Sequence, residues 1–377
     1  MLDGHSTTRR GVLGGVGGIT AGIAGCMGNG TDAGSEGGAA NGTDAGSEGG
    51  AANGTDAGSE GGAADGAFPE RTVEIVVPFS TGGGFDEYAR ISQPYWERHI
   101  DGDETVRVEN VEGAGGRTGA TSVFTDDDPH RMLFWYPSAA LPPQIVGDQN
   151  YDVTEMPPIG AMARDPNALV VRSGTGVESL SDLGAAVGDL RFGTQGVGSA
   201  AHTVSLMLGA TTDLVDPDDF EFVHYSGTGE AQNGLNSGEI DAMIVGTASS
   251  AANLHDAIDD VELLTTFGTP EEGELYADRT REFSSETAVD GIDEYAELTQ
   301  FVRMLVAPPG ISESALSTLR GAFDAVIADE EFIAEAEGRD RPVLNPADHE
   351  TVARIVADRQ AVYSEEPLRG AFEESLG

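Results

Sequence analysis

Hydrophobic positions are distributed unevenly along the chain. From about residue 68 onward, short runs of apolar and β-branched residues recur, and most are closely followed by glycine, serine or proline. Runs of this length and composition predict β-strands. The strands predicted in this way are 73–79, 105–111, 131–137, 168–172, 190–194, 220–225, 240–246, 261–267 and 299–307.

Segments of helical character lie between most of these strands. Two helices near the C-terminus have recognisable starts. Ser312 is a suitable N-cap for a helix running to about Asp329. Asn345 followed by Pro346 predicts the beginning of the last helix. Strands that alternate with helices indicate an α/β fold with mostly parallel sheets.

Residues 1–67 have almost no large apolar side chains outside a short N-terminal stretch. Adjacent Arg9 and Arg10, a weakly apolar stretch and Cys26 resemble a twin-arginine signal peptide, residues 1–25, that ends at a lipobox. Cys26 would then carry a lipid. The stretch is too short and too rich in glycine for a good membrane-spanning helix. The alternative is a chance cysteine behind a signal peptide.

A twelve-residue unit, NGTDAGSEGGAA, occurs three times between residues 29 and 64. It contains no apolar side chain larger than alanine, so it predicts a flexible linker over 26–67, of which the repeat residues alone have a root-mean-square span of about 30–36 Å. Each unit opens with a glycosylation sequon, at Asn29, Asn41 and Asn53. Compositional drift explains these sequons equally well.

The charge balance restricts the possible partners. The chain has 65 acidic and 20 basic residues, a net charge of −45, and every basic residue is arginine. Such a surface repels polyanions, so nucleic acid is excluded as a partner. The periodic apolar segments argue against a disordered acidic protein. We interpret the composition as adaptation to concentrated salt, because 1 M salt shortens the Debye length to about 3 Å.

Four loops rich in small residues follow predicted strands directly: 78–86, 111–120, 136–143 and 193–202. Ligands of such sheets bind beyond the carboxyl ends of the strands. Loops of this kind offer backbone N–H groups at helix N-termini, which suit an anion. A few charge-assisted hydrogen bonds of roughly 1.5–3 kcal/mol each reach the ~8 kcal/mol of micromolar binding.

A nucleotide phosphate is a poor candidate for this anion. The first loop has Glu87 where a dinucleotide motif needs a third small residue. Gly196, Gly198 and Ala201 fit that motif, but the next strand is not followed by the acid that would bind a ribose. A P-loop needs lysine, which the chain lacks. The sequence therefore predicts no cofactor.

Catalytic and metal-binding spacings are also missing from the sequence. No histidine pair has helical spacing, and no serine nucleophile elbow occurs. Ser199 and His202 are interpreted as lining a pocket, as a helix cap with a packed imidazole, or, least well, as a catalytic pair. Asp86 is interpreted as a helix-dipole partner, a ligand contact or a brace for the glycine loop. The sequence predicts no catalytic residue and no metal site.

Five segments together resemble the substrate-binding proteins of tripartite tricarboxylate transporters. They are RTVEIVVPFSTGGGFDEYAR, VRVENVEGAGGRTGA, FGTQGVGSAAHTVSLML, VHYSGTGEAQNGLNSGEIDA and LVAPPGISESALSTL, in family order from about 71 to 362. The resemblance implies a two-domain, periplasmic-binding-protein-like (Venus flytrap) fold hinged by crossover strands. Such a protein captures a small tricarboxylate, dicarboxylate or related organic acid for a membrane transporter. The acidic segment 268–297 departs from the family pattern.

The resemblance also implies domain limits and ligand-binding residues. The first domain would comprise 68–167 plus 298–377 and the second 168–297. The implied ligand-binding residues of the first domain are Phe79, Ser80, Thr81, Gly82, Gly83, Gly84, Asp86, Gly115, Gly116 and Ser138. Those of the second domain are Thr194, Gly196, Gly198, Ser199, His202 and Tyr225.

Other classes of protein remain open. A receptor for a sugar or nucleoside would need stacking aromatics and side-chain amides, and the loops offer only Phe79, Phe85, Tyr136 and Gln195. A hydrolase or dehydrogenase and a surface adhesion module are further alternatives. The favoured expectation is a monomer, lipid-anchored on the extracellular face of the membrane. Its partners would be a small carboxylate and integral membrane transporter subunits.

Overall fold

The computed structural model describes residues 68–100, 102–147 and 149–376. The predicted signal peptide, the lipid anchor at Cys26, the repeat linker and the three sequons lie outside these residues. Those parts of the sequence analysis stay predictions.

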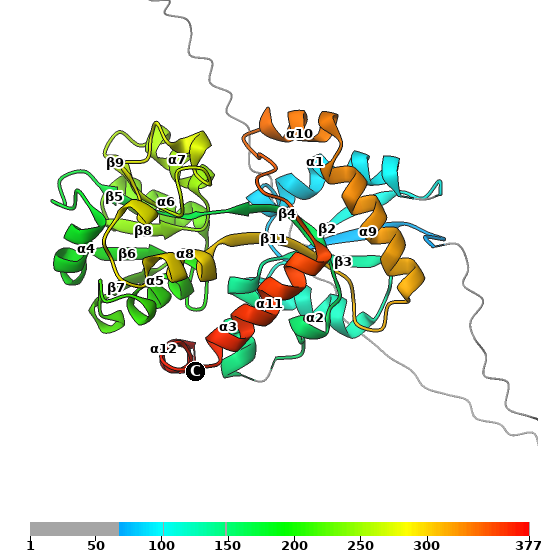
Figure 1. The fold of residues 1–377 in the computed structure, drawn as a ribbon, viewed down its shortest axis with the longest axis horizontal. Coiled ribbons are helices and arrows are strands. Elements are labelled where there is room, and N and C mark those ends of the chain that lie inside the picture. Colours follow the sequence, from blue (N-terminus) through cyan, green and yellow to red (C-terminus); the bar gives the residue numbers. More distant parts are fainter. Residues whose placement is uncertain (1–67, 101, 148, 377) are drawn as a thin grey trace, which may run out of the picture. The chain divides into compact units, whose positions relative to one another are not determined.

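Two six-stranded sheets organise the described residues (Figure 1). The first has the strand order β12-β4-β11-β3-β1-β2. Its strands are β1 (Val73–Val77), β2 (Val106–Asn110), β3 (Arg131–Trp135), β4 (Pro158–Asp165), β11 (Phe301–Val306) and β12 (Ala347–Asp348). The second has the order β10-β9-β5-β8-β6-β7. Its strands are β5 (Asn167–Arg172), β6 (Arg191–Thr194), β7 (Glu221–His224), β8 (Ala242–Val245), β9 (Val261–Phe267) and β10 (Glu282–Phe283).

Both sheets mix parallel and antiparallel pairing. β1 is parallel to β2 and β3, and β6 is parallel to β7 and β8. Every antiparallel pairing involves β4, β5 or β11. The expected parallel βα units are therefore present, and each sheet is completed by strands that enter it from the other.

Two connections join the sheets. β4 ends at Asp165 and β5 begins at Asn167, so the chain passes from one sheet to the other through Pro166 alone. β11 returns to the first sheet and pairs with β4 over six residue pairs, from Phe301 opposite Asp165 to Val306 opposite Pro158. Figure 1 shows β4 and β11 running together between the two halves. The chain passes from one sheet to the other near both predicted domain limits. The limits themselves stay a prediction.

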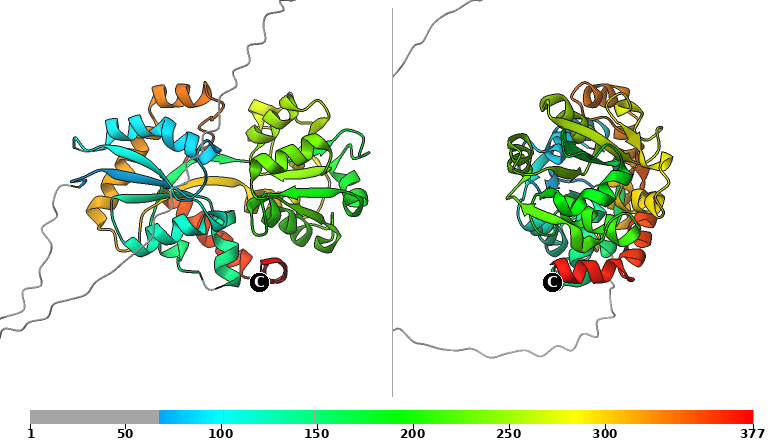
Figure 2. Two further views of the ribbon diagram at one scale, coloured as in Figure 1. Left: turned by 180° about the vertical axis from the view of Figure 1, so that it is seen from behind. Right: turned by 90° about the vertical axis from the view of Figure 1, so that its left-hand side faces the viewer.

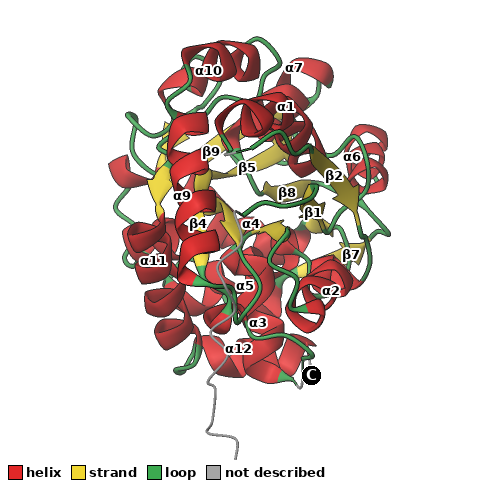
Figure 3. Ribbon diagram, turned by 90° about the vertical axis from the view of Figure 1, so that its right-hand side faces the viewer, coloured by secondary structure: helices red, strands yellow, loops and turns green. Residues whose placement is uncertain are grey.

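Helices cover both sheets (Figure 2). They are α1 (Gly84–His99), α2 (Arg117–Asp126), α3 (Pro137–Val146), α4 (Leu180–Ala186), α5 (Ala200–Thr211), α6 (Thr228–Ser237), α7 (Ala248–Ala257), α8 (Ile292–Thr299), α9 (Glu313–Ile327), α10 (Glu330–Glu337), α11 (His349–Tyr363) and α12 (Leu368–Leu376). Helices α9 and α11 both contact β4, and Figure 3 shows α9 lying across that strand. None of the described helices is both long and apolar enough to cross a membrane.

The last helix, α12, contacts elements of both halves of the fold. It packs against α3, which follows the first sheet's β3, and against α5, which follows the second sheet's β6. Leu376 lies so close to Gly198 that a β-carbon there would meet its Cδ2 at 3.3 Å. The end of the described chain therefore reaches the second glycine loop directly.

The predicted elements correspond closely to the observed ones. All nine predicted strands are present, with small shifts at their ends, and Ser312 caps α9 through the Ala315 N–H. The start predicted at Asn345 and Pro346 is wrong. Asn345 has a φ of 45°, Ala347 pairs with β4, and Asp348 is the N-cap of α11. Strand β4 was not predicted at all.

Candidate functional site

The first glycine loop, 78–84, joins β1 to α1. Ser80, Thr81, Gly82 and Gly83 are exposed, and Gly83 is the N-cap residue of α1. Gly82 has a φ of 83°, a left-handed conformation in which a glycine is favoured. This geometry turns the chain sharply at the carboxyl end of β1 and brings the loop backbone to the surface.

The buried side chain of Asp86 fixes the conformation of this loop through hydrogen bonds. Its side chain is 2 % exposed, accepts the Gly82 N–H at 2.8 Å and pairs with Arg90. Arg90 in turn donates to Asn110 on β2, and Asn110 donates to the Phe79 carbonyl oxygen. Burial alone would raise the pKa of Asp86, but the hydrogen bonds from Arg90 and Gly82 lower it below its ordinary value. Of the predicted roles for Asp86, the structure shows the brace.

The GAGG turn, residues 113–116, lies beside the first loop. Gly115 and Gly116 have φ values of 68° and 98°. A β-carbon at Gly116 would meet the Trp135 indole Nε1 at 2.8 Å and the Phe79 ring at 3.4 Å. Only glycine fits this position, and the predicted residues at 79 and 116 are brought together.

The second glycine loop, 195–199, joins β6 to α5 in the other sheet. Gly196 and Gly198 have φ values of 115° and 75°. Ser199 is the N-cap of α5 and accepts the His202 N–H. Thr194, fully buried at the end of β6, bonds through Oγ1 to the His224 ring at 2.6 Å.

His202 has the position in this loop that Asp86 has in the first. Its Nδ1 accepts the Gly198 N–H at 3.1 Å, so this nitrogen carries no proton and the ring is neutral. The ring packs edge-on against Phe222 and His224. Burial, assisted by the neighbouring His224, lowers the pKa of His202 to about 4. The packed imidazole and the Ser199 cap were both among the interpretations of the sequence.

Backbone N–H groups remain unused in both loops. Within the described residues, no hydrogen bond engages the N–H groups of Ser80, Thr81 or Gly84 in the first loop. The same holds for Gln195, Val197 and Ala200 in the second. Each loop thus fixes two glycine N–H groups internally, those of Gly82 and Gly83 in the first and of Gly196 and Gly198 in the second. It presents others at a helix N-terminus, where an anion is favoured.

Two other predicted ligand-binding residues, Tyr225 and Ser138, are not exposed. The Tyr225 backbone N–H donates to the Thr194 carbonyl oxygen, which aligns the ends of β7 and β6. Its ring packs on α6, where a β-carbon at Gly234 would meet the phenol oxygen at 2.1 Å. Ser138 is 1 % exposed in the first turn of α3. Neither side chain is freely accessible in this structure.

Four rings, Phe79, Phe85, Tyr136 and Phe301, form what we call the aromatic row. Phe79 lies 5.0 Å from Phe85 and 5.9 Å from Tyr136 between ring centroids, and Tyr136 lies 4.4 Å from Phe301. Phe85 and Tyr136 are buried, whereas Phe79 and Phe301 are partly exposed. The row extends from the first loop to the connection strand β11.

A buried ion pair crosses the connection between the sheets. Arg303 on β11 pairs with Asp165 on β4, and both side chains are almost fully buried. The guanidinium lies over the Tyr88 ring at 4.5 Å and the Phe301 ring at 4.9 Å. Burial would lower the pKa of Arg303, but the Asp165 carboxylate raises it above its ordinary value, so the guanidinium stays charged. Burial raises the pKa of Asp165, and the charge of Arg303 opposes that rise.

Arg117 is the one arginine for which the described residues provide neither a hydrogen bond nor an ion pair. It begins α2 immediately after Gly116. Its charge opposes the rise in the pKa of Tyr151 that burial causes, so it lies near that phenol. The sequence analysis did not single out this residue.

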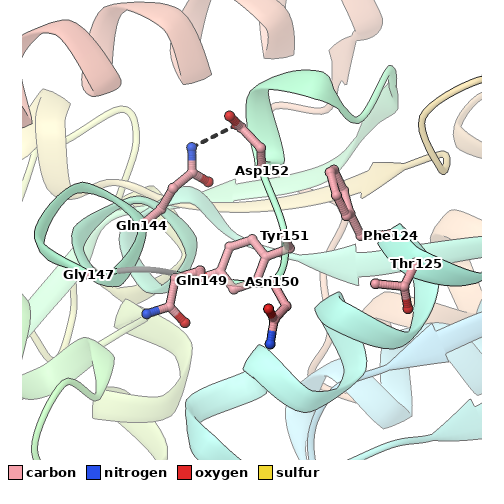
Figure 4. A pocket seen from close by; sticks show the side chains of 8 residues that line it. All are labelled: Phe124, Thr125, Gln144, Gly147, Gln149, Asn150, Tyr151 and Asp152. Atoms are coloured by element: carbon pink, nitrogen blue, oxygen red, sulfur yellow. Dashed lines mark hydrogen bonds between the residues drawn. The ribbon is translucent and has the colours of Figure 1, made fainter.

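A surface cavity of about 490 Å³ lies apart from the predicted residues (Figure 4). Gln144, Asn150, Tyr151 and Asp152 are among its lining residues, and Gln144 donates to Asp152 at 2.7 Å. None of the predicted ligand-binding residues lines it. Within the described residues, no cluster of three or more histidine, cysteine or acidic side chains could hold a metal ion.

Sequence analysis missed several residues that shape these loops. Arg90 could have been found, because an aspartate and an arginine four residues apart on a helix commonly pair. Asn110 and Phe301 reach the site from distant strands, and no local pattern marks them.

The fold and the loops define a class of protein. Two mixed α/β sheets joined by crossover strands, each with glycine-rich loops at its strand ends, are the architecture of the two-domain periplasmic binding proteins. The chain belongs to the tripartite tricarboxylate transporter family receptor family, whose model matches residues 99–363.

Comparison with known proteins agrees with this assignment. The chain is 30% identical over 205 residues to the "UPF0065 protein in tcbD-tcbE intergenic region" of Pseudomonas sp. (strain P51), covering 50% of this chain and 56% of that protein. The structure is similar to MatC from Rhodopseudomonas palustris with bound malate, with a TM-score of 0.65 and 22% identity, covering 79% of this chain and 99% of that one. It is also similar to R. palustris Rpa4515 with adipate, with a TM-score of 0.62 and 20% identity, covering 81% and 98%.

The chain spans about half the length of the curated relatives that it matches. The two structural likenesses, at 22% and 20% identity, show the fold.

Proposed function

We propose that this protein is an extracytoplasmic receptor that captures a small carboxylate between its two glycine loops and delivers it to membrane transporter subunits. A tricarboxylate, a dicarboxylate or a related organic acid is the expected ligand. The proposal extends to a lipid anchor on Cys26 after export by the twin-arginine route, and to a monomer adapted to concentrated salt. It includes no enzymatic activity and no cofactor.

One observation carries the proposal. At the carboxyl ends of β1 and β6, a glycine N–H is bonded internally while neighbouring N–H groups are left without a partner in the described residues. Groups of this kind at a helix N-terminus bind a carboxylate without a basic side chain. In a chain of net charge −45, a site built from backbone dipoles avoids the need for lysine or a cluster of arginines.

The family and the structural neighbours support the same ligand class. The family model is that of a tripartite tricarboxylate transporter receptor, and two similar structures carry malate and adipate. Both ligands are carboxylates. A receptor for an uncharged solute is the alternative, and it has no comparable support in the loops.

The test is thermal unfolding of the full-length chain in molar KCl against a carboxylate library, with neutral sugars and nucleotides as controls. A ligand that binds only the native state adds about 2.7 kcal/mol at a hundredfold excess over its dissociation constant. We expect stabilisation by one or a few carboxylates. Stabilisation by sugars or nucleotides and by no carboxylate would overturn the proposal.

Gly83→Val is the matching variant. Gly83 has a φ of −79°, and a β-carbon there makes only an ordinary 3.4 Å contact with the Ser80 oxygen, so valine is tolerated while its branches obstruct the exposed amides. We expect folding to survive and carboxylate stabilisation to disappear. Gly321→Val on the exposed face of α9, where a β-carbon meets nothing within 4 Å, is the control and should retain the ligand response.

A further inference from the structure

Exposed apolar side chains are rare on this surface. Among the described residues, only two large hydrophobic side chains are strongly exposed, Val197 at 61% and Leu275 at 54%. Val197 is in the second glycine loop, between Gly196 and Gly198, where its own N–H has no partner within the described residues. An apolar side chain thus stands among the amides that are proposed to bind the ligand.

The aromatic row brings a second apolar surface to the carboxyl ends of β1 in the first sheet and β8 in the second. It begins at Phe79, next to the exposed residues of the first loop, and ends at Phe301 on β11. A β-carbon at Gly246, which directly follows β8 of the second sheet, would meet the Phe301 ring at 2.9 Å. The row therefore lies between the end of the first sheet's β1 and the end of a strand of the second sheet, and both of its terminal rings are partly exposed.

We propose that Val197, Phe79 and Phe301 determine specificity by contacting the carbon body of the ligand, and that they select carboxylates with an unsubstituted hydrocarbon body over hydroxylated ones. This inference rests on the proposed function and narrows its ligand class. Backbone amides of the two loops bind the carboxylate groups of the ligand. The apolar side chains cover the hydrocarbon part of the ligand between those groups.

The selection follows from the cost of burying a hydroxyl group. A ligand hydroxyl facing aromatic and valine side chains loses its hydrogen bonds to water and gains none. For one such group the expected loss of affinity is about tenfold to a hundredfold. Removing the hydroxyl removes this penalty and leaves the charge of the ligand unchanged.

The experiment compares ligands that differ only in hydroxyl groups. Dissociation constants of the full-length chain are measured by titration calorimetry in molar KCl for succinate, malate and tartrate, for glutarate and 2-hydroxyglutarate, and for tricarballylate and citrate. In every set that binds, we expect the unsubstituted acid to bind at least about tenfold more tightly than its hydroxylated partner.

Val197→Thr is the decisive variant, because threonine has nearly the shape of valine and the position is exposed, so folding is unaffected. The new hydroxyl offers a hydrogen-bond partner, and we expect the discrimination to narrow by about threefold to tenfold. Leu275→Thr is the matched control at the other exposed hydrophobic position and should leave the discrimination unchanged. Phe79→Gln is a second variant on the opposite side, with thermal unfolding as the check on its fold.

The outcomes separate this inference from the proposed function. Equal or tighter binding of the hydroxylated acids, or discrimination that neither Val197→Thr nor Phe79→Gln alters, overturns the inference and leaves a carboxylate receptor. Absence of binding by every acid in the series overturns the proposed function, and the inference with it. The inference is supported if Val197→Thr and Phe79→Gln both reduce the affinity difference between unsubstituted and hydroxylated acids and Leu275→Thr does not.

Discussion

The first and second glycine loops share a geometry and differ in the chemistry that maintains it. In each, a glycine with positive φ donates its N–H to a side chain four residues later in the first turn of the following helix. In the first loop the acceptor is the Asp86 carboxylate, tied by Arg90 and Asn110 back to the backbone. In the second it is the neutral imidazole of His202, enclosed by aromatic rings.

This difference shows that the geometry does not depend on charge. An ionic acceptor gives the first loop strong hydrogen bonds that persist into acid. A neutral acceptor gives the second loop a weaker hold, which protonation removes. The two loops should therefore fail under different conditions, although they would bind the same ligand.

The largest effect is expected from Asp86→Ala. It leaves the Gly82 N–H and one side of Arg90 without their partner, and hydrogen bonds to charged groups contribute about 1.5–3 kcal/mol each. We expect the free energy of unfolding to fall by about 2–4 kcal/mol, measured by denaturant unfolding in molar KCl. Asp259→Ala, at an exposed aspartate, is the control. A loss no greater than that of the control would show that the first loop needs no brace.

Acid should distinguish the two loops next. The pKa of His202 is lowered to about 4, so its neutral form contributes stability that is complete above pH 6.5 and is lost as pH falls towards 4. His224, whose pKa burial also lowers, adds to this loss. The pKa of Asp86 is lowered from 3.8, so its contribution is lost only at more acidic pH. One proton gives a slope of up to about 1.4 kcal/mol per pH unit.

His202→Gln tests this assignment, because glutamine can accept the Gly198 N–H and does not titrate. Between pH 7 and pH 4, the free energy of unfolding should depend less steeply on pH for His202→Gln than for the wild-type protein. Asp86→Ala should keep the wild-type slope in this range. An unchanged slope in His202→Gln would place the titration elsewhere.

His202→Leu measures the neutral brace itself. Leucine fills part of the space but leaves the Gly198 N–H without an acceptor, so a loss of about 1–3 kcal/mol is expected. Carboxylate affinity, measured by calorimetry, should fall with it because the loop amides lose their fixed arrangement. If Leu and Gln variants behave alike, the hydrogen bond to Gly198 does not matter.

The smallest effects are expected from the glycines. Gly82→Ala and Gly198→Ala should each cost about 1 kcal/mol for the left-handed backbone. Gly82 has free space, whereas a β-carbon at Gly198 meets Leu376 at 3.3 Å. Gly198→Ala should therefore cost more, and Leu376→Ala should relieve only that excess. A double-mutant cycle of unfolding free energies measures this coupling.

Much of this fold could be predicted because most strands are short apolar runs bounded by small residues. Strand β4 was missed because PIGAMARD mixes proline, glycine and alanine and is buried along most of its length, so it lacks the alternation that marks a half-exposed strand. The helix predicted to begin at Asn345, observed as α11, was placed too early because Asn345 adopts a turn and Ala347 pairs with β4. Tertiary pairing decided both cases.

The candidate site was predictable only where chemistry is local. Glycines followed by Asp86 or His202 indicated the loops, and the caps followed from spacing. The network through Asn110 and the contact between Phe301 and Gly246 join segments far apart in the chain, and a single sequence carries no sign of them. Arg117 is distinguished by the partners it lacks among the described residues, which only coordinates can show.

The ion pair between Arg303 and Asp165 has a consequence for desalted protein. Salt screens exposed charges, so removing it strengthens repulsion across an acidic surface, but solvent ions do not reach a pair that is almost fully buried. Lowering the salt concentration should therefore destabilise the exposed outer elements before the buried connection between the sheets. In hydrogen–deuterium exchange at low salt, amides of β4 and β11 should be the last to lose protection, so that the two halves stay connected after their outer helices have begun to open.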